Sequence, residues 1–180
     1  FALDYYREKL YFDVEFQKYL QFKFYEQWSK LKQYANEKHI QIVGDMPIYV
    51  SADGSDIWAQ PEMFQLDENN KPTRIAGCPP DSFSADGQVW GNPLYRWDYH
   101  KATGYQWWVT RMWYSYKLYD MVRLDHFRGF DEYFAIPADS TSAADKMSST
   151  GLTMVMISSS MGVCTLANRM TVPFSSRRAT

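Results

Sequence analysis

The longest stretch of regular hydrophobic spacing lies near the start of the chain. Across residues 13–38, apolar and aromatic side chains recur every three or four positions, which is the period of an amphipathic helix. The members of this apolar stripe are Phe16, Leu20, Phe24, Trp28, Leu31 and Tyr34. The pattern therefore predicts one long helix whose apolar side chains share a single face.

Two short apolar runs have the character of buried strands. Residues 40–43 follow the predicted helix and lead into Asp45, while residues 121–124 follow a second helical pattern over residues 98–117 and lead into Asp125. In parallel α/β barrels the active site lies at the carboxyl ends of the strands. The order of helix and strand therefore predicts that Asp45 and Asp125 point into one pocket.

Glycine, proline and asparagine punctuate the long segment 46–97 between these strands, as is typical of loops. Within it, short apolar runs on either side of Asn69-Asn70 predict a small hairpin over residues 64–75. A loop of this length within a compact domain indicates a functional loop or a small subdomain.

Composition divides the chain in two. All of the aromatic residues except Phe174 lie in residues 1–138, whereas residues 139–180 are rich in Ser and Thr. We consider two interpretations of the tail: a disordered low-complexity segment, or the product of a change of reading frame near residue 139. Either interpretation predicts a boundary between a folded segment, 1–138, and an unrelated tail, 139–180.

Charge and cysteine content argue against several protein classes. The net charge of −2 disfavours a general nucleic-acid binder, and no apolar run is long enough to span a membrane. Cys78 and Cys164 lie far apart and provide neither a disulfide framework nor a zinc site. We see no secretory signal pattern, so the expectation is a cytoplasmic protein without a metal or cofactor.

Three motif blocks carry a specific resemblance. They are GDMPIYV at 44–50, a segment from PPDSFS to QVWGNPLY within 79–95, and VRLDHFRGF at 122–130. Together they closely resemble the 4-α-glucanotransferases of the amylomaltase type, glycoside hydrolase family 77, over about residues 1–138. The resemblance implies a partial (β/α)8 TIM barrel, with about strands three to four and an inserted loop subdomain.

The resemblance also implies a reaction. The family transfers an α-1,4-glucan segment to the 4-hydroxyl of an acceptor sugar by a retaining double displacement. Asp125 falls at the catalytic nucleophile, and Arg123 falls at the arginine that supports it by favouring the charged carboxylate. The acid/base glutamate of the family lies further along the chain, and residues 139–180 contain no glutamate. We therefore expect negligible transfer by this chain alone.

Several further positions are implied to bind α-1,4-glucans or maltooligosaccharides. These are Asp45, Tyr49, Phe83, Ser84, Trp90, Asn92 and His126. Taken alone, Asp45 has the alternative of capping a turn, and Asp125 with Arg123 that of a structural ion pair. His126 lacks a second ligand at helical or hairpin spacing, so a metal site is rejected.

The tryptophans outside these blocks have a simpler interpretation. Trp28, Trp107, Trp108 and Trp113 lie on helical patterns and are predicted to be core, while Trp58 and Trp97 are left undecided. Three hypotheses for the chain follow: a glucanotransferase segment, a non-catalytic α-glucan-binding fragment, or a product that does not fold. The sequence does not specify an oligomeric state.

Overall fold

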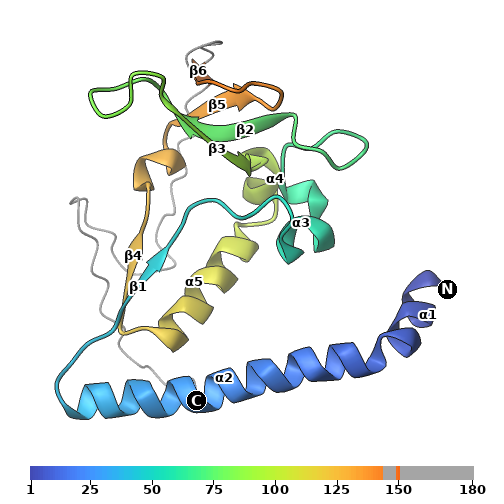
Figure 1. The fold of residues 1–180 in the computed structure, drawn as a ribbon, viewed down its shortest axis with the longest axis vertical. Helices are drawn as coiled ribbons and strands as arrows, with labels where there is room; N and C mark the ends of the chain where they lie inside the picture. The colour runs from blue at the N-terminus through green and yellow to red at the C-terminus, as the bar shows by residue number, and fades with distance from the viewer. Residues whose placement is uncertain (144–148, 151–180) are drawn as a thin grey trace.

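Helices and two small sheets make up the part of the chain that the computed structural model describes, residues 1–143 and 149–150 (Figure 1). The helices are α1 (Ala2–Lys9), α2 (Tyr11–Glu37), α3 (Ser55–Ala59), α4 (Trp97–Ala102) and α5 (Gln106–Leu118), with short 3₁₀ helices at Pro61–Met63 and Phe127–Phe130. The strands are β1 (Val43–Met46), β2 (Arg74–Cys78), β3 (Gln88–Pro93), β4 (Met121–Leu124), β5 (Tyr133–Pro137) and β6 (Ser149–Thr150). The predicted disorder of the tail concerns mainly residues 144–148 and 151–180, which lie outside the described residues.

The long predicted helix is confirmed as α2, which runs along one edge of the structure (Figure 1). Its apolar stripe is largely exposed; Phe16, for example, keeps 57% of its surface. Within the stripe, Trp28 contacts the end of α5: its indole N–H donates to the Leu118 carbonyl at 2.8 Å. No helix in the described part of the chain has the length and apolar character that crossing a membrane requires.

β1 and β4 form a two-stranded parallel sheet. The strand predicted over residues 121–124 is confirmed as β4, whereas the strand predicted over residues 40–43 is wrong in position, because β1 begins at Val43. The shift has a long-range cause: the Asp120 carboxylate accepts the Ile42 N–H at 2.8 Å, so pairing with β4 starts only after that residue. The mixed α/β class is confirmed, and closure into a barrel stays a prediction.

The helix predicted over residues 98–117 is interrupted. It forms as α4 and α5, because Gly104 and Tyr105 adopt positive φ angles of 64° and 55°. The left-handed conformation cannot continue a right-handed helix, so α5 starts in a new direction after this corner.

An antiparallel sheet with the strand order β3-β2-β5-β6 occupies the long segment that precedes α4 and the segment after β4. The predicted hairpin over residues 64–75 is confirmed by an antiparallel bridge between Leu66 and Pro72 and by the Asp67 N–H donating to the Lys71 carbonyl at 2.8 Å. The segment therefore forms a small subdomain beside the parallel strands (Figure 1).

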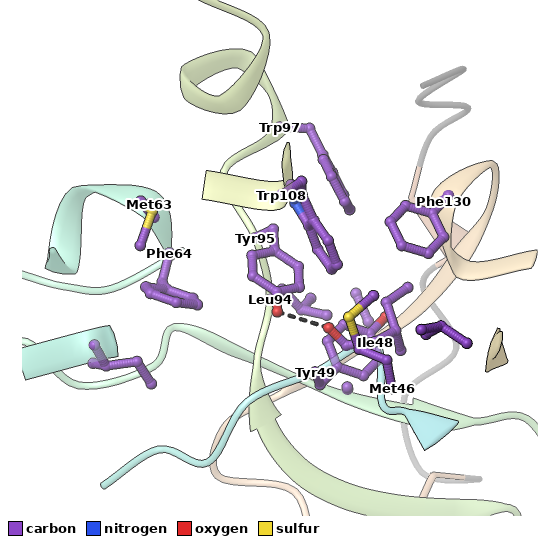
Figure 2. Close-up of a cluster of buried hydrophobic side chains, with 14 residues drawn as sticks. Met46, Ile48, Tyr49, Met63, Phe64, Leu94, Tyr95, Trp97, Trp108 and Phe130 are labelled. Atoms are coloured by element: carbon purple, nitrogen blue, oxygen red, sulfur yellow. Dashed lines mark hydrogen bonds between the residues drawn. The ribbon is translucent and has the colours of Figure 1, made fainter. Parts of the chain in front are cut away.

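An aromatic core joins the two sheets (Figure 2). Tyr95 is 1% exposed and stands edge-on to Trp108, whose ring stacks on Trp97 at a centroid distance of 5.9 Å. The core assignment of Trp108 is confirmed and that of Trp113 is wrong, because Trp113 is 47% exposed and lies under the Lys117 ammonium.

Trp107, which is predicted to be core, and Trp58, which is left undecided, differ in burial. Trp107 is half-buried and also contacts Tyr95, whereas Trp58 is 82% exposed. The tail residue Ala143 is buried against Ile75 and Ile136, so the folded part extends slightly past residue 138.

Candidate active site

Asp45, Arg123 and Asp125 meet at the carboxyl ends of the two parallel strands. Asp45 lies opposite Arg123 in the register of β1 and β4, and Asp125 directly follows β4. One guanidinium nitrogen of Arg123 donates to Asp45 at 2.6 Å and the other donates to Asp125 at 2.7 Å. The two carboxylates therefore converge on one arginine, and the single pocket predicted for them stays a prediction.

This carboxylate pair lies on an open surface. The side chains of Asp45, Arg123 and Asp125 are 60%, 58% and 48% exposed. Hydrogen bonds to Asp45 and then to Asp125 raise the pKa of the guanidinium, so it stays charged. Ion pairs on such an exposed surface contribute little to stability. Their main effect is therefore to hold the two carboxylates in a fixed position.

His126 projects beside the pair from a left-handed backbone, with φ of 48°. Gly129 makes room for its ring, since a Cβ at Gly129 would lie 2.8 Å from His126 Cδ2. The His126 ring also meets Trp90 edge-on at a centroid distance of 5.1 Å. Burial lowers the pKa of His126, against the opposing effect of the Asp125 charge, so the neutral imidazole is favoured.

Tyr49 completes an aromatic wall. Its ring is buried, lies 6.1 Å from the Trp90 ring and stacks on Tyr95. Because Trp90 keeps part of its surface exposed while Tyr49 backs it, Trp90 is the member of this wall that can offer a face to a ligand.

The loop 79–87 carries two further predicted residues and is organised by itself. Asp81 accepts the backbone N–H groups of Phe83 and Ser84 at 2.8 Å each, and the Ser84 hydroxyl donates to the Gly87 carbonyl. Phe83 is left 94% exposed. The loop therefore presents an exposed aromatic ring, and the hydrogen bonds that hold Phe83 and Ser84 lie within the loop.

Asn92 serves the scaffold at this edge. Its amide donates to the Val50 carbonyl at 2.8 Å, which ties β3 to the segment after β1. Among the predicted site residues, the structure thus groups Asp45, Arg123 and Asp125 by ion pairs, and Tyr49, Trp90 and His126 by ring contacts.

The motif blocks contain two supporting residues that the sequence analysis did not single out. Gln88 accepts the indole N–H of Trp90 at 2.9 Å, and Asp81 caps the loop. An aspartate directly before two loop residues is a recognised turn signal, so Asp81 was open to prediction. Gln88 was not, because its contact depends on the side-chain direction of Trp90.

No group of three or more His, Cys, Asp or Glu suited to a metal ion occurs among residues 1–143. A hollow of about 840 Å³ lies between α2 and α5 and includes none of the predicted site residues; its lining combines Tyr25, Trp28, Tyr114 and Leu118 with polar side chains.

Comparison with known proteins decides the family. The family model described as 4-alpha-glucanotransferase matches residues 1–160. The chain belongs to the 4-alpha-glucanotransferase family. This match includes part of the predicted tail, so it runs past the limit at residue 138 that the sequence analysis set for the resemblance.

Individual relatives agree with this assignment. A 4-alpha-glucanotransferase of Streptococcus pneumoniae is 55% identical over 143 residues, which is 79% of this chain and 28% of the relative. One from Clostridium butyricum is 50% identical over 132 residues, covering 73% of this chain and 27% of the relative. The chain therefore spans less than a third of the length of these relatives.

A solved structure shows the same fold for most of the chain. The amylomaltase of Streptococcus agalactiae, in complex with acarbose, superposes with a TM-score of 0.77 at 51% sequence identity. The match covers 80% of this chain and 29% of that one.

Proposed function

We propose that this chain is the nucleophile-bearing segment of a retaining 4-α-glucanotransferase barrel. The observation that carries the proposal is the arginine fork, in which Arg123 binds Asp45 and Asp125 at the ends of adjoining parallel strands. Asp125 would attack the anomeric carbon of an α-1,4-glucan, expel the leaving sugar and form a glycosyl ester. An acceptor 4-hydroxyl would then take the glycosyl group and regenerate the free carboxylate.

The same fork explains why a further residue is needed. A general acid must deliver a proton to the leaving oxygen as the glycosidic bond breaks. Asp45 accepts a hydrogen bond from the guanidinium that also binds Asp125, so in this fork it acts as an acceptor and not as a proton donor. We therefore assign Asp45 to holding the donor sugar, and the proton to a residue outside this pair.

His126 and Trp90 are proposed to border the donor sugar on its aromatic side. Their edge-on contact supports this role, because it would hold a neutral imidazole and an indole ring beside the proposed nucleophile. Tyr49 would support Trp90 from below, and the exposed Phe83 would cover an extended glucan from the loop. The amylomaltase solved with acarbose supports an oligosaccharide as the ligand class.

For the chain by itself we propose binding without transfer. Calorimetry with maltoheptaose tests binding, and incubation with maltotriose tests transfer. We expect binding in the millimolar range or tighter and no formation of glucose with longer maltodextrins. Absence of any heat at about 10 mM ligand, a concentration at which a millimolar site is nearly filled, would exclude the binding fragment.

The catalytic role requires the rest of a barrel. Because the Streptococcus pneumoniae relative aligns over 143 residues, the matching segment of that enzyme can be replaced by the one from this chain. The hybrid should convert maltotriose into glucose and longer maltodextrins, and its Asp125→Asn form should not. Glucose without longer products would instead indicate hydrolysis and contradict the transferase assignment.

A further inference from the structure

Arg111 is a charged side chain of α5 that reaches the segment following β1. One of its terminal nitrogens donates to the Pro47 carbonyl at 2.7 Å and the other donates to the Ile48 carbonyl at 3.2 Å. Its guanidinium carbon also lies 5.1 Å from the centroid of the Trp107 ring. The side chain is thereby held by a ring while both of its nitrogens bind the main chain of one short segment.

The Ile48 carbonyl has a second donor. The buried Tyr95 hydroxyl donates to it at 2.7 Å, and Figure 2 shows this bond as a dashed line between the Tyr95 ring of the aromatic core and the segment after β1. Two side chains from different elements, Arg111 and Tyr95, therefore bind one carbonyl oxygen. An oxygen with two lone pairs is fully used by such an arrangement, so the peptide plane has little freedom to rotate.

This peptide lies directly under the candidate site. The Ile48 side chain is 3% exposed, and its Cδ1 lies 2.8 Å from the position that a Cβ of Gly129 would occupy. His126 Cδ2 is the same distance from that position. Ile48 and the His126 ring thus pack against the same glycine, while the neighbours of Ile48 along the chain lead back to Asp45.

We infer that Arg111 is a positioning residue for the glucan site. Together with Tyr95 it holds the peptide at Pro47 and Ile48. Through Ile48 it fixes the position of the His126 ring, and it also fixes the orientation of Asp45 at the end of β1. It contacts no substrate itself. This inference concerns the arrangement of the site and rests on the proposed function only where glucan affinity is measured.

A lysine at this position separates geometry from charge. Arg111→Lys keeps a cation next to Trp107 but has one nitrogen where two are needed to reach both carbonyls. Tyr95→Phe keeps the ring packing and removes only the second donor to Ile48. Arg7→Lys and Tyr34→Phe, both at exposed positions of the N-terminal helices, are the matched controls.

The test uses the 180-residue chain and two readouts. The first is the NMR signal of the His126 Cε1–H and of the Trp90 indole N–H; the chain has 3 histidines, and the exposed His39 serves as an internal reference. The second is the dissociation constant for maltoheptaose. Both are recorded well below the melting temperature of every variant, so that a loss of stability alone does not change them.

We expect both site variants to move the His126 and Trp90 signals while the His39 signal stays in place. We also expect them to weaken maltoheptaose binding about tenfold, the effect of losing one well-made hydrogen bond to a charged or buried group. The control variants should do neither.

Unchanged His126 and Trp90 signals in Arg111→Lys would overturn the inference and show that Arg111 only stabilises the fold. If Arg111→Lys does not fold, the Tyr95→Phe signals decide in the same way. If the parent chain binds no maltoheptaose, the proposed binding by this chain fails, and the two NMR signals still decide the role of Arg111.

Discussion

Asp120 offers the sharpest test of how the two parallel strands are joined. Its carboxylate accepts the Ile42 N–H at 2.8 Å and the Asn36 amide at 2.9 Å, and it lies 3.4 Å from the Lys32 ammonium. The side chain is only 18% exposed. It therefore fastens the end of α2 and the start of β1 to the start of β4.

Replacement by alanine removes all three contacts and leaves the Ile42 N–H without its acceptor. A hydrogen bond to a charged group contributes about 1.5–3 kcal/mol, and a buried donor without a partner costs about as much. Because water reaches part of this cluster, we expect Asp120→Ala to lower the free energy of unfolding by about 2 kcal/mol. Asp120→Asn keeps an acceptor for Ile42 and should cost about 1 kcal/mol.

Urea denaturation followed by tryptophan fluorescence measures both variants, with exposed Asp86→Ala as the control. The midpoint should move while the slope with denaturant stays constant, since the same surface unfolds. Burial raises the pKa of Asp120, but the bonds from Ile42, Asn36 and Lys32 outweigh it and lower that pKa below 3.8. The stabilisation by Asp120 is therefore fully present above pH 3.8, the ordinary pKa of the group, and is lost as the pH falls through its lowered pKa in the folded protein. Changes within about 0.5 kcal/mol for Asp120→Ala would refute the reasoning.

Three further predictions address burial, packing and the site. His100 is fully buried, its Nδ1 has no hydrogen-bond partner, and burial lowers its pKa. The melting temperature should therefore fall as the pH drops through about 6.5, where the histidine of the unfolded chain takes up a proton. His100→Gln should make the melting temperature depend less on pH in this range. Gly77→Ala should cost about 2 kcal/mol in urea titrations, because a Cβ there would lie 2.2 Å from the Gln88 carbonyl oxygen; a smaller loss than about 0.5 kcal/mol would disprove the close approach. Trp90→Ala should weaken maltoheptaose binding about tenfold in calorimetry while exposed Trp58→Ala does not; equal effects would remove Trp90 from the site.

The sequence correctly predicted those elements whose conformation depends mainly on neighbouring residues in the chain. The helix α2 and the strand β4 were found because periodicity and an apolar run are properties of adjacent residues. β1 was placed too early because its start depends on Asp120, far along the chain. The break before α5 required Tyr105 to adopt a positive φ, which sequence indicates weakly for a residue other than glycine.

The exposed stripe of α2 shows a different limit. Periodicity identifies which side chains share a face, and it does not identify what covers that face. Phe16 and Leu31 fit the predicted pattern and are 57% and 53% exposed. Burial is a property of the partner surface, so it follows only from tertiary contacts.

At the site, the motif blocks identified the residue types and the structure supplied their connections. Two carboxylates at strand ends were expected to converge, and the register of β1 with β4 brings them to Arg123. The left-handed backbone of His126 and the space that Gly129 leaves for its ring were not predictable, because Gly129 also faces Ile48, which is distant in the sequence.

The most direct test of the central claim is to identify the carboxylate that becomes glycosylated. The hybrid enzyme carrying this segment would be incubated with an activated fluoro-sugar donor whose ester is hydrolysed slowly, and its peptides analysed by mass spectrometry. The proposed function predicts a single added sugar on the peptide that contains Asp125 and none in the Asp125→Asn form. A sugar on the Asp45 peptide, or continued transfer by Asp125→Asn, would contradict the assignment of the nucleophile.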